Sequence, residues 1–370
     1  MHILVDYRAA LRERTGVGHY AHELVRALVA SSPPDQILSV FSSSWTDRLD
    51  PARVPGARVI DRRVPVRVLN SLWHRWEWPP IELLAGTRVD IAHSLHPLLM
   101  PARRAAQVVT IHDLDFLDHP ERSGAEIRRD YPALAAAHAT RADRVIVISQ
   151  HTAGEVERRL GVPASRISVC VPGAPEWPRR AHEPVPGSVL FVGTLDARKN
   201  VGALIDAYAR VVAARPDAPP LVLAGRKTPD ADVWLPRIDE RPLAGHVRMA
   251  GYVPHAELLA LYNDAILLVM PSHHEGFGIP ALEAMTTGVP VVAADRGALP
   301  EVIGDAGLLV DPMDAEAFAA TILRALADRS LRDTLRERGW RRAAGRQWAD
   351  TASAARDAYA LALDARRQRG

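Results

Sequence analysis

Residues 271–285 read PSHHEGFGIPALEAM and directly follow the apolar run 266–270. That run is short and aliphatic, as is typical of a buried strand. The Gly-Phe-Gly stretch at 276–278 predicts a tight turn, and Pro280 suits the first turn of a helix. We therefore expect a strand, a glycine turn and a helix N-terminus, whose free backbone N–H groups bind anionic or hydroxyl-rich ligands.

Two carboxylates occupy this stretch, Glu275 and Glu283, eight positions apart. We expect Glu275 in the turn and Glu283 in the first helical turn, both facing a ligand. A carboxylate accepts paired hydrogen bonds from vicinal hydroxyls, so Glu283 suits a ribose. The alternative is that Glu283 only complements the helix dipole. The neighbouring Glu275 and the glycine turn favour the ligand-binding interpretation.

Short apolar runs alternate with helical periodicity along the whole chain. Strands are expected at 3–5, 37–41, 91–93, 108–111, 145–148, 167–171, 189–192, 221–224, 247–249, 266–270 and 289–293, and helices at 17–30, 122–139, 150–160, after Asn200 and at 351–366. Because the strands are apolar throughout, they predict parallel sheets covered by helices on both faces. The fold class is therefore α/β, with two doubly wound domains.

A proline-rich segment at 171–187 separates the two halves and predicts a stiff linker. We expect a first domain at 1–178, a second at 179–350 and a terminal helix at 351–370 that folds back on the first domain. Ligands bind at the carboxyl ends of the strands in such folds, which predicts a cleft between two facing domains.

The composition is that of a globular protein, with 370 residues of which 48% are hydrophobic and 24% charged. The net charge of +2 gives no reason to expect a nucleic-acid partner. The single cysteine, Cys170, excludes an internal disulfide and favours a reducing compartment. No apolar run reaches the length of a membrane helix, so the expected location is the cytoplasm.

A second motif, FVGTLDARKN at 191–200, places Arg198 and Lys199 between a strand and a helix. Cations at a helix start oppose the helix dipole, so their presence there requires another reason. Fixed cations stabilise the charge that develops on a diphosphate leaving group. A solvated surface pair is the alternative interpretation.

Two candidate sites lie in the first domain. Gly16 and Gly18 follow the opening strand, and small residues let a backbone approach a phosphate closely. An ordinary loop is the alternative, because the full dinucleotide-binding fingerprint is missing. His112 ends the strand 108–111, and the adjacent Asp113 is a candidate for orienting its ring.

The segment EGFGIPALEAM at 275–285, followed by GVPVVA at 288–293 and LPEVIGDAG at 299–307, resembles retaining transferases of glycosyltransferase family 4. The resemblance implies the two-Rossmann (GT-B) architecture and a sugar-nucleotide donor. It also implies that Glu275 and the backbone of Gly276, Phe277 and Gly278 contact the donor sugar, while Glu283 holds the ribose.

The same resemblance assigns roles to the other motifs. Arg198 and Lys199 match the segment that binds the donor pyrophosphate, although this chain has Thr194 where the family often has arginine. Gly16 and Gly18 match a loop that touches the donor phosphate. His112 matches a residue that contacts the donor sugar.

These matches imply a retaining hexosyl transfer that needs no metal, since cations and helix ends supply the positive charge. The segments 113–120 and 193–200 resemble bacterial mannosyltransferases of surface-polysaccharide assembly. This implies GDP-mannose as donor, with a UDP-sugar as the alternative, and a glycan or lipid-linked acceptor.

Three other functions stay open from the residues. The first is a sugar-nucleotide epimerase on the same scaffold, and the second is a nucleotide-sugar binding module without activity. The third is a metal-dependent hydrolase using the acids and histidines His93, His96, His112, Asp113, Asp115 and His119. A strand aims positions three apart in different directions, which disfavours a metal shared by His93 and His96.

The segment 72–80 contains Trp73, Trp76 and Trp78 and lies close to the basic residues at 62, 63 and 67. Core packing is the favoured interpretation of tryptophans at helical spacing. The alternative is an acceptor-binding or membrane-surface patch, because tryptophan and arginine favour the headgroup boundary. That alternative would place the protein peripherally at the inner face of a membrane.

Overall fold

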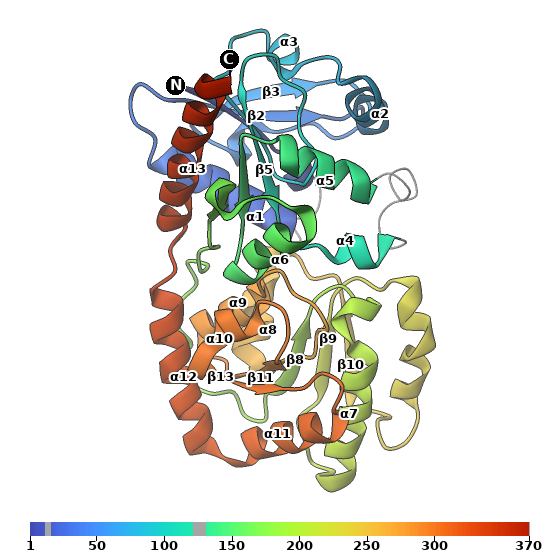
Figure 1. The fold of residues 1–370 in the computed structure, drawn as a ribbon. Coiled ribbons are helices and arrows are strands. Elements are labelled where there is room, and N and C mark those ends of the chain that lie inside the picture. The colour runs from blue at the N-terminus through green and yellow to red at the C-terminus, as the bar shows by residue number, and fades with distance from the viewer. Residues whose placement is uncertain (12–15, 121–130, 370) are drawn as a thin grey trace. The chain divides into compact units, whose positions relative to one another are not determined.

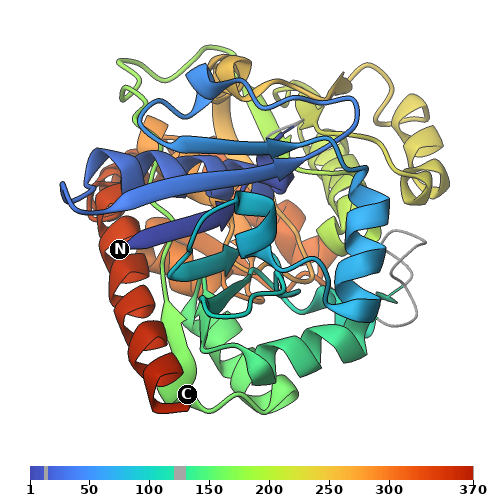
Figure 2. The same cartoon turned by 90° about the horizontal axis from the view of Figure 1, so that it is seen from above.

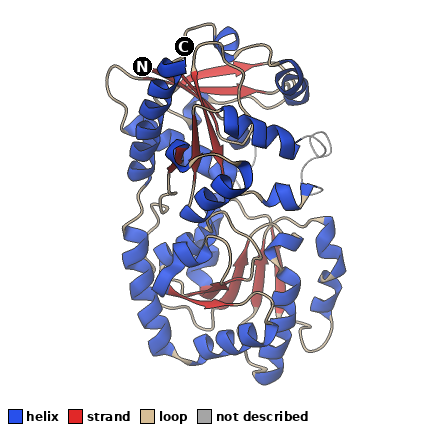
Figure 3. Ribbon diagram, in the orientation of Figure 1, coloured by secondary structure: helices blue, strands red, loops and turns tan. Residues whose placement is uncertain are grey.

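The computed structural model describes residues 1–11, 16–120 and 131–369. The chain forms two compact units: unit 1 contains Met1–Gly173 and Gln347–Gly370, and unit 2 contains Ala174–Arg346. Each unit is built on a parallel sheet flanked by helices, as Figure 3 shows. Among the described residues, no helix is both long and apolar enough to span a bilayer.

The sheet of unit 1 has the strand order β3-β2-β1-β4-β5-β6-β7, and all its neighbours are parallel. Its strands are β1 (His2–Asp6), β2 (Ile37–Ser43), β3 (Arg58–Arg62), β4 (Ile91–Ser94), β5 (Ala106–Ile111), β6 (Arg144–Val147) and β7 (Ile167–Val169). The order reverses beside β1, where Val5 pairs with Val40 on one side and His93 on the other. Ligands bind in such folds at the carboxyl ends of the strands around this reversal.

The helices of unit 1 are α1 (Val17–Ala30), α2 (Val66–Trp76), α3 (Ile81–Ala85), α4 (Asp115–Asp118), α5 (Tyr131–Arg141), α6 (Gln150–Leu160) and α13 (Trp348–Arg369). Helix α6 shows how short-range residues set the two ends and the buried face of such a helix. Ser149 caps it by accepting from the Thr152 N–H, Val156 and Leu160 are buried, and Gly161 ends it in the left-handed region.

The sheet of unit 2 has the order β10-β9-β8-β11-β12-β13, again with parallel neighbours throughout. Its strands are β8 (Ser188–Val192), β9 (Leu221–Ala224), β10 (Val247–Gly251), β11 (Ala265–Met270), β12 (Val291–Ala294) and β13 (Gly307–Val310). Its helices are α7 (Val201–Ala214), α8 (His255–Asp264), α9 (Ile279–Thr287), α10 (Leu299–Ile303), α11 (Ala315–Ala327) and α12 (Arg329–Ala344).

The expected fold class, two doubly wound parallel-sheet units, is confirmed. Two edge strands, β3 and β13, were not predicted. β3 contains Arg58, Asp61 and Arg62 and is mostly exposed or half-buried, whereas β13 is apolar but only four residues long, three of them half-buried. The helix expected at 122–139 is described from Tyr131, while residues 121–130 lie outside the described part of the chain.

Helix α13, at the end of the chain, belongs to unit 1 and runs along that unit in Figure 1. Its Tyr359 is fully buried, and the hydroxyl lies 2.8 Å from His93 Nδ1. The other ring nitrogen of His93 lies 2.8 Å from Thr110 Oγ1. Burial lowers the pKa of His93 to about 3, so its ring is neutral. The terminal helix is thus joined to strands β4 and β5 by a buried hydrogen-bond chain.

We expect Tyr359→Phe to destabilise the protein by about 1–3 kcal/mol, because it leaves a buried imidazole nitrogen without its partner. Urea unfolding followed by circular dichroism measures this cost. Tyr252→Phe is the matched control, since Tyr252 is 38% exposed and its loss should change stability by less than about 0.5 kcal/mol. Equal stabilities for the two variants would contradict the prediction.

Candidate active site

The centre of the site in unit 2 is the carboxylate of Glu275, in the turn that follows strand β11. Glu275 is only 5% exposed, and its Oε1 accepts hydrogen bonds from Lys199 Nζ at 2.6 Å and from Ser272 Oγ at 2.8 Å. Arg198 Nη1 lies 3.8 Å from Oε2. Burial opposes ionisation, but Lys199 and Arg198 outweigh it and lower the pKa of Glu275. Glu275 is therefore a buried carboxylate held ionised by two cations.

The turn that carries the two cations is fixed by its own side chains. Asp196 caps it by accepting from the Lys199 N–H at 3.0 Å. Asn200 adopts the left-handed conformation at φ 54°, which asparagine tolerates better than most residues. Its side-chain amide donates to the carbonyls of Pro271 and Pro312 at 3.2 and 2.9 Å. The cations are thus positioned before any ligand binds.

The glutamate turn is held from two other directions. The His273 N–H donates to the Arg198 carbonyl at 2.9 Å, which joins the two turns directly. On another side the Ala298 N–H donates to the Glu275 carbonyl at 3.0 Å. Gly297 has φ +60°, and a Cβ there would approach the Glu275 carbonyl oxygen to 2.7 Å. Only glycine fits this position without displacing the turn that carries Glu275.

The glycine turn and the following helix form as expected. Gly278 lies in the left-handed region at φ 107°, and Pro280 occupies the first turn of α9. The Phe277 side chain is buried, with the Arg346 guanidinium 5.6 Å from its ring centroid, so the ring is part of the packing of unit 2.

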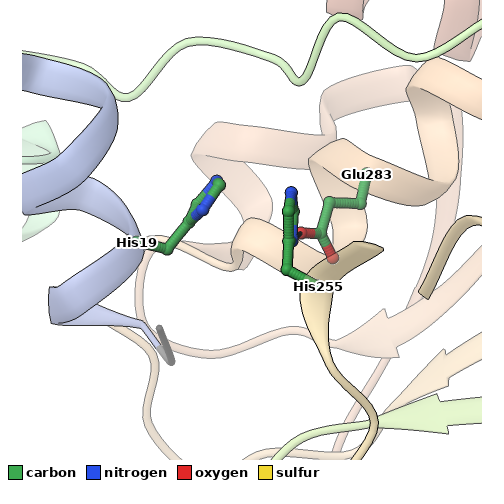
Figure 4. Close-up of side chains that lie close together, drawn as sticks. All are labelled: His19, His255 and Glu283. Atoms are coloured by element: carbon green, nitrogen blue, oxygen red, sulfur yellow. Dashed lines mark ion pairs between the residues drawn. The ribbon is translucent and has the colours of Figure 1, made fainter. Parts of the chain in front are cut away.

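Glu283 lies in the second turn of α9, so its expected place in the first turn is wrong: the helix begins directly after Gly278, which makes Glu283 its fifth residue. Tyr262 donates to Glu283 Oε2 at 2.7 Å. His255 Nδ1 lies 3.9 Å from Oε1 (Figure 4), and Trp177 stacks on the His255 ring at 5.0 Å. Burial raises the pKa of Glu283 to about 7, although the Tyr262 hydrogen bond lowers it in part.

In unit 1, His112 lies directly after strand β5. Its Nε2 donates to the Leu95 carbonyl at 3.1 Å, and the Tyr20 ring packs edge-on at 5.1 Å. Burial lowers the pKa of His112 to about 4, so the ring is neutral and Nδ1 keeps its lone pair. Asp113 was expected to orient this ring. Among the described residues the Leu95 carbonyl holds the ring, while the charge of Asp113 opposes in part the lowering of the His112 pKa.

The two glycines of unit 1 occupy different positions at the start of α1. Gly16 is the N-cap residue at φ 40°, whereas Gly18 lies inside the first turn and is buried. Thr15, which completes the motif, lies outside the described residues. The helix start offers its first backbone N–H groups at the carboxyl edge of the sheet.

Both halves of the chain match family models. Residues 14–175 match Glycosyltransferase Family 4, and residues 179–342 match Glycosyl transferases group 1. The chain is also 30% identical to the O-antigen chain mannosyltransferase B of Escherichia coli, over 94% of this chain and 96% of that protein. The chain belongs to glycosyltransferase family 4. It is a retaining transferase of this family.

Solved structures show the same fold at lower identity. Sucrose-phosphate synthase from Thermosynechococcus elongatus superposes with a TM-score of 0.78 at 23% identity, covering 97% of the transferase and 98% of that chain. HepE from Anabaena, solved in complex with UDP and glucose, gives a TM-score of 0.72 at 19% identity, covering 96% and 98% of the two chains. These matches establish the GT-B fold of the transferase.

The histidines considered for a metal site have separate partners in the transferase. His93 is engaged by Tyr359 and Thr110, as described above. His96 Nδ1 accepts from the Leu98 N–H at 3.2 Å, and its Nε2 lies 3.3 Å from Asp6. Both nitrogens of each ring therefore have polar partners within unit 1.

The structure adds residues that sequence reasoning missed. Ser272 could have been found, since it lies three residues before Glu275 in the same motif. Tyr262 lies on α8, and nothing in its local sequence predicts a contact with a glutamate 21 positions away. The sequence also did not predict that Lys199 pairs with Glu275 directly, across 76 positions.

We expect Lys199→Met to destabilise the transferase by about 3 kcal/mol, because a buried carboxylate loses its nearest cation. The double variant Lys199→Met/Glu275→Gln should recover most of that loss, since it buries no unpaired charge. Thermal and urea unfolding measure the stability of the single and of the double variant. Lys227→Met is the control. It removes the ion pair of Lys227 with Asp232, in which the lysine side chain is 53% exposed, so it should change stability little. A single variant as stable as wild type would contradict the prediction.

A second experiment tests the environment of Glu283. The folded carboxyl keeps its proton up to about pH 7, whereas the unfolded one loses it near pH 4.5, so wild-type stability falls as pH rises between these values. Glutamine does not titrate. The stability of Glu283→Gln relative to wild type should therefore increase from pH 5 to pH 8, by at most about 3 kcal/mol.

Melting temperatures across that pH range measure this difference. Glu316→Gln, at an exposed position on α11, is the control and should show no such trend. A constant difference between Glu283→Gln and wild type from pH 5 to pH 8 would show that burial does not raise the Glu283 pKa.

Proposed function

We propose that the transferase moves a mannosyl unit from GDP-mannose to a hydroxyl of a glycan or lipid-linked acceptor in cell-surface polysaccharide synthesis, with an α product. The mannosyltransferase relative supports the sugar. A UDP-sugar is the alternative donor, because the structurally similar HepE was solved with UDP. We place the reaction in the cytoplasm, at the inner face of a membrane.

The observation that carries the proposal is the buried Lys199–Glu275 pair with Arg198 beside it. One carboxylate and two cations leave a local excess of positive charge. A donor diphosphate would satisfy that excess, with Lys199 and Arg198 stabilising the charge that grows on the leaving group. The N-terminus of α9 adds backbone N–H groups near the same turn.

Retention follows if the leaving diphosphate assists attack on its own face. In this mechanism the acceptor hydroxyl loses its proton to a diphosphate oxygen and bonds to the anomeric carbon on the side that the diphosphate leaves. Glu275 would stabilise the positive sugar instead of bonding to it. Its Oε1 supports this role, since Lys199 and Ser272 already occupy that oxygen and reduce its nucleophilicity.

Two other residues complete the proposed donor site. Glu283, whose Oε2 accepts a hydrogen bond from Tyr262, would also accept hydrogen bonds from the ribose hydroxyls. His112 would accept a hydrogen bond from a donor-sugar hydroxyl through Nδ1, the nitrogen that Leu95 leaves available. Gly16 and Gly18 would offer the first N–H groups of α1 to the donor phosphate.

A thermal-shift screen of GDP, UDP, GDP-mannose and UDP-sugars tests the donor. We expect GDP-mannose to stabilise the transferase most, by about 2.7 kcal/mol at a hundredfold excess over Kd. Strongest stabilisation by a UDP-sugar would contradict the donor assignment. Donor binding without transfer to any glycan acceptor would indicate a binding module.

With a productive acceptor in hand, Glu275→Gln, Lys199→Ala and His112→Ala test the residues. We expect the Glu275 and Lys199 changes to lower kcat by about a hundredfold or more, as loss of preorganised charge does. NMR of the product reports its anomeric configuration. Glu316→Gln is the control and should keep wild-type turnover. Wild-type turnover in all three site variants would show that the site is elsewhere.

A further inference from the structure

The carboxylate of Glu283 lies in a largely apolar part of unit 2. Its helix, α9, packs against α8, α10 and α12, and the neighbouring strands β11 and β12 consist of apolar residues. On the side of α12, Gly339 lies beside Met285, and on the side of α10, Leu299 lies beside Gly278. Within the described part of unit 2, the titratable side chains that face Glu283 therefore come from α8.

Two side chains of α8 approach the two oxygens of this carboxylate. The Tyr262 hydroxyl donates to Glu283 Oε2 at 2.7 Å and lies 3.3 Å from the Pro280 carbonyl. A hydroxyl has one proton to donate, and the shorter contact shows that the carboxylate receives it. His255 Nδ1 lies 3.9 Å from Oε1, beyond hydrogen-bond distance. Oε1 therefore accepts no hydrogen bond within the described part of the chain.

The hydrogen bond from Tyr262 also decides where an acid proton would lie. Burial favours the neutral carboxyl and raises the pKa of Glu283 to about 7, while the Tyr262 hydrogen bond favours the charged form. Because Oε2 already accepts from Tyr262, the proton of the neutral form would lie on Oε1. A protonated Oε1 presents an O–H donor to a hydroxyl that needs an acceptor. The neutral form is therefore a poor partner for a ribose.

We propose that Tyr262 is a positioning residue of the donor site: its hydrogen bond keeps Glu283 in the charged form, with Oε1 available to the ribose hydroxyls. The inference deepens the proposed function and rests on its ribose contact at Glu283. Tyr262 is fully buried, so it acts on the donor through the glutamate and touches no donor atom itself. Without its hydroxyl, more of the protein at neutral pH would carry a protonated Glu283.

Paired nucleotides test the proposal. GDP and 2′,3′-dideoxy-GDP differ only in the ribose hydroxyls, so the ratio of their Kd values, called the hydroxyl ratio, isolates what those hydroxyls contribute. Titration of the phosphates cancels in this ratio. Calorimetry from pH 5.5 to pH 9 measures both Kd values, and the matching uridine nucleotides replace them if UDP binds more tightly.

In the wild type we expect a hydroxyl ratio of about tenfold or more at pH 8, because a hydrogen bond to a charged group contributes at least that much. The ratio should fall below pH 7, since Glu283 then binds a proton and only the charged fraction accepts from the ribose. The contribution is thus present above the pKa of Glu283 and lost below it.

Two changes at position 262 should move this profile in opposite directions. Tyr262→Phe removes the donor, so the profile should shift to higher pH. Its hydroxyl ratio should be several-fold below wild type at pH 7 and recover at pH 9, where Glu283 is charged in both proteins. A 3-fluorotyrosine at position 262 keeps the hydroxyl and donates more strongly, so the profile should shift to lower pH. This second change keeps the test open if the phenylalanine variant does not fold.

Two further variants are the controls. Tyr208 is also fully buried, and its hydroxyl donates to the Pro219 carbonyl. Its helix α7, yellow-green in Figure 2, packs against α11, whereas α8 packs against α9. Tyr208→Phe should therefore lose stability but keep the wild-type profile. Glu283→Gln does not titrate, so its hydroxyl ratio should be small and equal at every pH.

A Tyr262→Phe profile that coincides with wild type would overturn the proposal. A hydroxyl ratio lowered equally at every pH would also overturn it, because the variant would then have lost packing alone. If the wild-type ratio is close to one throughout, the ribose contact of Glu283 is wrong as well. If Glu283→Gln abolishes the pH dependence while Tyr262→Phe leaves it in place, only the role of Tyr262 is wrong.

Discussion

The ion pair between Lys199 and Glu275 is the interaction on which the site in unit 2 depends. A lone carboxylate at 5% exposure would bind a proton instead of staying ionised, and a lone buried lysine would lose one. Together with Arg198 they form a group with one negative and two positive charges, each satisfied in part by the others. Such a group is stable without a ligand and still attracts an anion. The charges are already arranged in the folded protein, so an anion that binds beside them would meet a preorganised field.

The two glutamates of the motif show how one short segment supports two different chemistries. Glu275 lies among cations, and its pKa is lowered in spite of its burial. Glu283 has a phenol and a histidine ring as its neighbours, and burial raises its pKa to about 7. One residue is a permanent charge, and the other is close to balance between charged and neutral forms. Environments that separate the pKa values of paired carboxylates are typical of sites that give each a distinct role.

The sequence predicted the central strands and the motif turn because each depends on residues close together in the chain. Continuous apolar runs identified β8, β9 and β11, whereas β3, which has three charged residues among five, was not predicted. Ser272, Tyr262 and the direct contact of Lys199 with Glu275 depend on which turns the fold brings together, and local patterns carry no such information. Helical spacing placed Trp73 and Trp76 on one helix, but only the position of α2 on the sheet separates the buried ring from the exposed one.

Unit 1 uses its polar residues in a different way. At the reversal beside β1, Asp6, Arg8 and Asn70 satisfy one another, and His93 is engaged by two hydroxyls. These side chains therefore build the framework and leave little hydrogen-bonding capacity for a substrate. In unit 2 the polar motif residues form the candidate donor site itself. This difference explains why the motif residues of unit 2 are recognisable from sequence, whereas the polar residues of unit 1 are less so. A framework can be retained while the exposed residues around it change, and substrate preference changes with them.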